Sequence, residues 1–286
     1  MKKKILILGA AGMAGHMLYY YLLNTNMYLL TALLYHEKIN TDSIICDVRD
    51  QKNLSIVIDR DDPDIIVNCI GALIDESKHH PDNAILLNSW LPHYLVNKCR
   101  NSKTKLIHIS TDCVFSGEKG CYAETDPPDA VDIYGRTKAL GEIINNKDAT
   151  LRASIVGPEL KTDGKGLFHW YMNQTGEIEG YQNALWSGIT TYHLAVSIEY
   201  VIEHNLCGLF NVTNGIPISK LDLLRLFFKY FHSDVNALKS NQHYSINKSL
   251  QKSLKFDFKI PEYEVMIIEL KKWMDNNISL YPQYSK

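Results

Sequence analysis

The 286-residue chain is predicted to be an α/β protein, a doubly wound parallel sheet with a smaller C-terminal lobe interleaved with it. Two observations predict this class. In the first half, short apolar runs alternate with segments of helical periodicity, the pattern of parallel strands covered by helices on both faces. The first apolar run also ends in three glycines, Gly9, Gly12 and Gly15, before the next helix. Ligands in such folds bind at the carboxyl ends of the strands, so functional residues are expected there.

Five short apolar runs in the first half are the predicted strands of the sheet, at 3–8, 29–34, 65–69, 105–110 and 150–153. Helical patterns separate them near 13–23, 51–60, 83–100 and 134–146. The segment 61–64, Asp-Asp-Pro-Asp, predicts a turn before the third strand.

The second half is less regular. A further strand is predicted near 209–212, and helices over 221–231 and 262–273. Because 194–204 and the strand near 210 are expected to return to the sheet, the two lobes are predicted to be interleaved. We therefore expect a dinucleotide-binding domain of 1–154 plus about 194–214, and a substrate-binding lobe of 155–193 and 215–286.

Composition argues against several classes of function. The net charge of −2 gives no reason to expect a nucleic-acid partner, and no apolar run approaches the length of a membrane span. Six cysteines lack a Cys-x-x-Cys pair, which favours reduced cysteines in a cytoplasmic protein. The eleven histidines show no metal-ligand spacing, so no metal site is expected.

The glycine segment, Gly9-Ala10-Ala11-Gly12-Met13-Ala14-Gly15, predicts dinucleotide binding. Glycine permits a tight turn and lets a pyrophosphate approach the backbone at a helix N-terminus. The alternatives are a strand-to-helix turn without a ligand, or a secretory signal beginning at the N-terminal lysines. The glycines interrupt the apolar stretch too early for a signal.

A second motif joins Tyr134 and Lys138, which lie four residues apart and share one helix face. An ammonium beside a phenol favours the phenolate, so we expect a lowered pKa for Tyr134 and a proton donor usable near neutral pH. The hydroxyl of Thr111 is a candidate to hold a carbonyl between them. A Tyr-x-x-x-Lys pair is common on its own, and here the glycine segment favours a catalytic role for it.

Together these motifs resemble the extended short-chain dehydrogenase/reductase family, and within it the dTDP-4-dehydrorhamnose reductase branch. The resemblance is carried by the glycines and by Asp47-Val48, 68–72, the asparagine of 87–92, 110–117, Tyr134-Gly135-x-Thr137-Lys138-x-x-Gly141-Glu142 and 151–154. It implies a Rossmann domain and an NAD(P)H-dependent oxidoreductase that reduces the 4-keto group of a nucleotide-linked 6-deoxyhexulose for surface-polysaccharide precursors. It is also compatible with a homodimer through the helices near 83–100 and 134–146.

The resemblance further implies roles for individual residues. Tyr134 would be the general acid, with Lys138 and Thr111 as its catalytic partners. The implied cofactor-binding residues are Gly9, Gly12, Met13, Gly15, His36, Lys38, Asp47, Val48, Cys69, Gly71, Ala72, Asn88, Ser110, Tyr134 and Lys138. The implied substrate-binding residues are Thr111, Asp112, Cys113, Arg152, Trp186 and Thr191.

The choice between NADP(H) and NAD(H) depends on the end of the second strand. Glu37 would serve the ribose 2′-hydroxyl of NAD, whereas His36 or Lys38 would serve a 2′-phosphate. NADP(H) is favoured because reductive biosynthesis in this family commonly uses it, and NAD(H) stays open.

Other functions remain as alternatives. Cys113 stands where related sugar-nucleotide dehydratases place a glutamate, and a thiol is a poor acid at neutral pH, which argues against a dehydratase. An epimerase or another hexulose reductase stays open, as does a non-catalytic dinucleotide-binding subunit like the regulatory subunit of methionine adenosyltransferase. Trp186 would stack on a base or fill the lobe interface, and Lys248 would pair with a diphosphate or be solvated.

Overall fold

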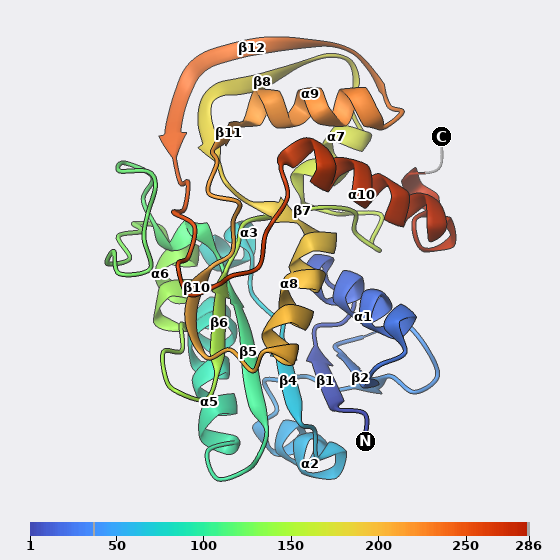
Figure 1. The fold of residues 1–286 in the computed structure, drawn as a ribbon, viewed down its shortest axis with the longest axis vertical. Helices are drawn as coiled ribbons and strands as arrows, with labels where there is room; N and C mark the ends of the chain where they lie inside the picture. The colour runs from blue at the N-terminus through green and yellow to red at the C-terminus, as the bar shows by residue number, and fades with distance from the viewer. Residues whose placement is uncertain (37, 285–286) are drawn as a thin grey trace.

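A computed structural model describes residues 1–36 and 38–284 (Figure 1). Its centre is a seven-stranded parallel sheet in the order β10-β6-β5-β4-β1-β2-β3. The strands are β1 (Lys4–Leu8), β2 (Leu29–Leu34), β3 (Ile44–Ile45), β4 (Ile65–Asn68), β5 (Lys105–Ser110), β6 (Ala149–Arg152) and β10 (Gly208–Asn211). The predicted doubly wound parallel sheet is confirmed.

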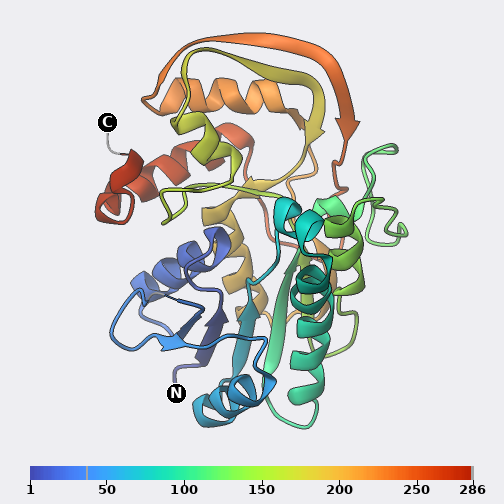
Figure 2. The same cartoon turned by 180° about the vertical axis from the view of Figure 1, so that it is seen from behind.

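Helices cover both faces of this sheet. On one face, α1 (Met13–Thr25) and α8 (Thr191–Glu203) pack together over strand residues such as Ile5 and Ile107. On the other, α2 (Gln51–Asp61) and α5 (Leu91–Lys98) pack over Leu6 and Ile66, as the view from behind shows (Figure 2). The central strands are therefore buried on both sides, which explains why they read as continuous apolar runs.

Two helices differ from their predicted bounds. The segment predicted as one helix near 83–100 comprises α4 (Pro81–Ala84), a π-helical stretch (Ile85–Trp90) and α5, and it follows a short α3 (Ile74–His79). The helix predicted over 134–146 is α6 (Ile133–Leu140) and ends six residues early. A Cβ on Gly141 would lie 1.9 Å from the carbonyl oxygen of Asn88, so the backbones touch there and only glycine fits at the helix end.

The upper lobe in Figure 1 is built on two long parallel strands, β8 (Thr175–Trp186) and β12 (Asp234–Asn247), which arch over α9 (Lys220–Tyr230). Two-residue β11 (Ile218–Ser219) pairs antiparallel with the end of β8. The other elements are β7 (Ile155–Val156), α7 (Leu167–Met172), β9 (Ile189–Thr190), α10 (Tyr263–Asn276) and three short 3₁₀ turns, at 112–114, 278–280 and 282–284.

The chain crosses between the sheet and the lobe more than once. It leaves the sheet after β6, forms α7 and β8, and returns through β9, α8 and β10 before building α9 and β12 (Figure 1). The carboxyl ends of the strands consequently face the lobe. Within the described residues, none of the helices has both the length and the apolar character needed to span a membrane.

Candidate active site

The glycine segment forms a tight turn between β1 and α1. Gly9 has a φ of 78°, and the amide groups of Gly9 and Ala10 both donate to the carbonyl of Leu33 at the end of β2. A Cβ at Gly15 would lie 2.1 Å from the carbonyl oxygen of Gly9, so helix and turn meet without room for a side chain. Gly12 begins α1 without a side-chain cap, so no side chain satisfies the first-turn amides. The turn thus fits a dinucleotide phosphate.

The loop after β4 borders this turn. A Cβ at Gly9 would touch Ile70, and one at Gly71 would lie 3.1 Å from Oδ1 of Asn88 and 3.8 Å from Nζ of Lys138. Asn88 is fully buried and bonds both backbone groups of Ala72, with Ala72 N donating at 2.8 Å. Asn88, expected among the cofactor-binding residues, thus holds the loop that carries Gly71 and Ala72.

Lys138 lies beneath this loop. Its side chain is 5% exposed, and Nζ donates to the carbonyl oxygen of Ile109 at 2.6 Å. Burial lowers the pKa of Lys138 to about 8, and the charges of Glu142 and Cys69 oppose that change.

Tyr134 stands one turn earlier on α6, whose N-terminus is capped by the side chain of Asp132 accepting from Gly135 N. Burial raises the pKa of Tyr134 above its ordinary value, and so does the neighbouring Cys113, while a hydrogen bond with Thr111 lowers it. The expected lowering of the Tyr134 pKa by Lys138 was therefore wrong for this structure. The reason is that loss of hydration disfavours the phenolate by more than the hydrogen bond with Thr111 favours it. Tyr134 is a neutral phenol at neutral pH, a proton donor.

The turn after β5 brings Thr111 to this phenol. Thr111 accepts from Cys113 N at 3.1 Å and donates to Oδ1 of Asp112 at 3.1 Å, which holds a 3₁₀ turn over 112–114. Thr111 and Asp112 are 7% and 4% exposed. Burial raises the pKa of Cys113 to about 12, so it is a neutral thiol. Residues Thr111, Cys113, Tyr134 and Lys138, predicted from two separate motifs, are brought together.

Arg152, expected near the substrate, is used differently. Its side chain is 2% exposed, and Nε and Nη2 each donate to one oxygen of Glu142 at 2.7 Å. Ser110 donates to the same carboxylate at 2.8 Å. Arg152 and Ser110 therefore share a buried network on Glu142, and a ligand role for either side chain stays a prediction in which the ligand competes with these protein partners.

Two other expected substrate residues lie where the lobe meets the sheet. Trp186 is 3% exposed, and its indole donates to Oγ of Ser154 at 2.7 Å. Thr191 is fully buried at the start of α8, and its hydroxyl has no hydrogen-bond partner among the described residues. Both side chains fill the junction between lobe and sheet, so stacking of Trp186 on a base is not supported by its burial.

At the other end of the site, the loops after β2 and β3 form a polar cluster. Asp47 accepts hydrogen bonds from Nε and Nη2 of Arg49. The Arg49 guanidinium also bonds the hydroxyl of Tyr35, and its Cζ lies 5.1 Å from the centre of the Tyr35 ring. The ring of His36 packs on Tyr35, and Lys38 donates to the carbonyl of Thr41 at 3.4 Å. Val48 is buried in the core. Glu37 lies outside the described residues.

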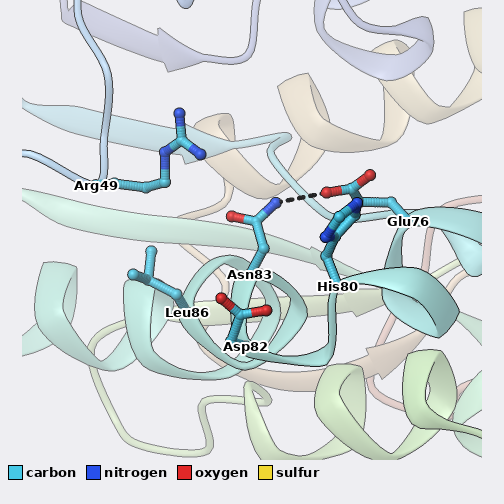
Figure 3. Close-up of a pocket in the computed structure, with 6 residues that line it drawn as sticks. All are labelled: Arg49, Glu76, His80, Asp82, Asn83 and Leu86. Carbon is cyan, nitrogen blue, oxygen red and sulfur yellow. Dashed lines mark hydrogen bonds between the residues drawn. The ribbon is translucent and has the colours of Figure 1, made fainter.

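Arg49 was missed by the sequence reasoning, although it directly follows the Asp47-Val48 pair. It reaches a cavity of about 450 Å³ between its loop and the α3–α4 segment, lined also by Glu76, His80, Asp82, Asn83 and Leu86 (Figure 3). Asn83 donates to Glu76 at 2.9 Å across the lining. Among the described residues, no group of three or more potential ligands could hold a metal ion.

Comparison with known proteins places the chain in one family. The model of the RmlD substrate binding domain family matches residues 2–280. A dTDP-4-keto-6-deoxy-D-glucose reductase from Streptomyces niveus is 28% identical over 82% of this chain and 81% of its own length. The methionine adenosyltransferase 2 subunit beta of Bos taurus is 28% identical over 56% of this chain and 48% of its own length. A dTDP-4-dehydrorhamnose reductase from Bacillus anthracis, solved in complex with NADP, has a TM-score of 0.79 at 23% identity and covers 94% of this chain and 99% of its own.

Proposed function

The chain belongs to the RmlD substrate binding domain family, and we propose that it reduces the 4-keto group of a nucleotide-linked 6-deoxyhexulose with a reduced nicotinamide cofactor. The observation that carries this proposal is the meeting of Thr111 and Tyr134 beside the buried Lys138, next to the uncapped glycine turn. Its relative from Streptomyces niveus is named for reduction of such a sugar. The product would be a precursor for a surface polysaccharide, made in the cytoplasm.

NADP(H) is the favoured cofactor. Gly9, Gly12 and Gly15 would cradle its pyrophosphate, with Met13, Cys69, Gly71 and Ala72 bordering it. Asp47, Val48, His36 and Lys38 would lie at the adenosine end. Arg49, which lines the cavity of Figure 3 while bonded to Asp47 and Tyr35, would bind a 2′-phosphate if it exchanged these partners for it, and this would favour NADP(H) over NAD(H).

The protein residues supply positioning and a proton. A bound reduced nicotinamide supplies the hydride. The neutral phenol of Tyr134 donates its proton to the ketone oxygen as negative charge develops on it. Thr111 would orient that oxygen by turning its single hydroxyl proton from Asp112 to the ketone. The ammonium of Lys138 favours the resulting phenolate electrostatically, which raises the rate when the proton leaves.

The substrate would be bound between the sheet and a lobe made of 155–193 and 215–286. Asp112 and Cys113 would contact the sugar from the sheet side. Two copies of the chain are proposed to pair through the segment of α5 and the preceding π-helical stretch and through α6. Apolar side chains are exposed on and beside the π-helical stretch and α6, which pack together, at Ile85, Val131, Leu140 and Ile144.

Turnover on a prepared ketone tests this function. The substrate is dTDP-4-keto-6-deoxyglucose, made from dTDP-glucose by a 4,6-dehydratase, and NADPH oxidation is followed by its absorbance. We expect one NADPH consumed per sugar reduced, with NADH a poorer donor. An epimerase would instead change the sugar with no net oxidation of cofactor.

The similarity to the methionine adenosyltransferase subunit favours a second candidate, a non-catalytic dinucleotide-binding subunit. The presence of Thr111, Tyr134 and Lys138 together favours the enzyme. Binding of NADPH without turnover of any 4-ketohexose nucleotide, together with co-purification of a transferase, would favour the subunit.

A further inference from the structure

A lysine of the lobe points at the substrate side of the site. Lys220 is the first residue of α9 and directly follows β11, whose Ile218 and Ser219 pair with Trp186 and Leu185. The ammonium of Lys220 lies 4.8 Å from the centre of the Trp186 ring. The side chain is only partly exposed to solvent.

The position of Trp186 fixes where this ammonium stands. The indole bonds Ser154, two residues past the end of β6, and β6 pairs with β5 so that Arg152 lies opposite Ser110. Thr111 directly follows β5 and begins the 112–114 turn. Lys220 therefore lies above the sheet edge that carries the 111–113 turn, close enough for the charge of Asp112 to act on it.

Within the described part of the chain, Lys220 makes no ion pair. The carboxylate of Asp112 acts on Lys220 electrostatically without forming an ion pair with it. Oδ1 of this carboxylate accepts a hydrogen bond from the hydroxyl of Thr111. Burial lowers the pKa of Lys220 below its ordinary value, the sign of a cation taken partly out of water without a close partner. Such a cation is costly unless an anion joins it.

A second lysine of the lobe lies near the loop that follows β5. Lys248 directly follows β12, and its Cγ would lie 3.0 Å from a Cβ at Gly117. Asn247 N donates to the carbonyl of Gly117 at 2.9 Å, which ties the end of β12 to the loop after β5. The positive charge of Lys248 acts on Cys113. Two lobe cations thus lie near the segment that follows β5.

We propose that Lys220 is a specificity-determining residue that binds the diphosphate of the sugar nucleotide from the lobe side, opposite Thr111 and Tyr134. This inference rests on the proposed function, because the diphosphate is the anionic part of that substrate. Lys220 would select diphosphate-linked sugars over free sugars and sugar monophosphates, while the sheet residues read the ketone.

Nucleotide binding without turnover tests this role. Calorimetry measures the dissociation constants of dTDP, UDP, dTMP and UMP for the wild type, Lys220→Met and Lys220→Arg. If Lys220 makes a charge-assisted contact with the outer phosphate, Lys220→Met should raise the dissociation constant of the better-bound diphosphate about tenfold. The dissociation constant of the matching monophosphate should change far less. Lys220→Arg should keep most of the preference. Lys229→Met, at the exposed far end of α9, is the matched control and should leave all four constants unchanged.

Two results would overturn the role of Lys220: an unchanged ratio of diphosphate to monophosphate affinity in Lys220→Met, or a wild type that binds neither diphosphate. Thermal unfolding of each variant separates loss of the contact from loss of the fold. The proposed reductase activity fails independently, if NADPH is not oxidised with any 4-ketohexose nucleotide while binding of dTDP or UDP still depends on Lys220.

Discussion

The ammonium of Lys138 donates to the backbone carbonyl of Ile109 at 2.6 Å. This contact ties α6 to the penultimate residue of β5, two residues before Thr111. The helix that carries Tyr134 is thereby held in register with the strand end that carries Thr111. The role of Lys138 is thus partly to position, and its buried charge is the element that can respond to pH.

Replacing Lys138 is expected to affect stability and function in opposite directions. Burial lowers the pKa of Lys138 to about 8 from the ordinary lysine value of 10.5. Below about pH 8 the ammonium is charged in both the folded and the unfolded state, and the folded state bears the cost of its desolvation. Between the folded-state pKa and the ordinary lysine pKa, the unfolded state binds more protons than the folded state. Wild-type stability therefore rises with pH over that range. Lys138→Met should therefore raise the free energy of unfolding at pH 7 by up to about 3 kcal/mol, less the lost bond to Ile109.

Denaturant unfolding of both proteins at about pH 7 and pH 10 measures this difference, and it should shrink at the higher pH. A difference that is constant with pH would contradict the assignment. Turnover of the variant should be lost at both values.

Replacing Tyr134 by Phe removes the proposed acid and leaves the ring. We expect kcat to fall about a hundred- to ten-thousandfold, because the proton then comes from water. NADPH affinity, measured by fluorescence titration, should change little. Full turnover of the variant would remove Tyr134 from its role.

Two glycines of the turn should behave differently when each is changed to alanine. A Cβ at Gly15 meets three backbone atoms within 2.9 Å, whereas one at Gly12 meets a single carbonyl oxygen at 3.3 Å. Gly15→Ala should cost at least about 2 kcal/mol of stability through overpacking. Gly12→Ala should fold normally and bind NADPH more weakly. Equal melting temperatures for the two variants would contradict this account of the turn.

Replacing Arg152 distinguishes a structural role of this side chain from a role in binding the substrate. Removing one partner of a buried ion pair leaves the other charge without compensation, so Arg152→Met should cost about 3–5 kcal/mol. The double variant Arg152→Met/Glu142→Leu should recover part of this loss in thermal unfolding. A stable Arg152→Met enzyme with a raised KM for the sugar nucleotide would instead return Arg152 to the substrate site.

Arg49 should govern the choice of cofactor. Arg49→Gln keeps a polar side chain but removes the charge, so the KM for NADPH should rise about tenfold and that for NADH should hardly change. The control is Lys38→Gln, a lysine of the neighbouring loop, which should have a smaller effect. Equal losses with both cofactors would show that Arg49 supports the adenosine end without reading the phosphate.

The parts of the fold with strong local signals were predictable. The strand predicted over 105–110 is β5, and the helix predicted over 51–60 is α2. β8 and β12 were missed because their outer faces are exposed and polar, so neither forms an apolar run. Their pairing is a contact between distant segments, which no local pattern records.

Most residues of the site were predictable from the sequence, but their arrangement and electrostatics were not. The spacing of Tyr134 and Lys138 predicted their common helix, but the raised pKa of Tyr134 depends first on its burial in the fold and then on the neighbouring Cys113. Lys220 lies more than a hundred residues from Asp112 in sequence and has no motif. Its place depends on how β11 pairs with β8.

The central claim is reduction at the sugar ketone with Tyr134 as the acid. It is tested most directly by NADPH carrying deuterium at the transferable position, with dTDP-4-keto-6-deoxyglucose as substrate and NMR of the product. The account predicts one deuterium on C4 of the sugar for each NADPH oxidised, and no label transfer in Tyr134→Phe above about one hundredth of the wild-type rate. An unlabelled C4, or a sugar altered without oxidation of NADPH, would contradict it.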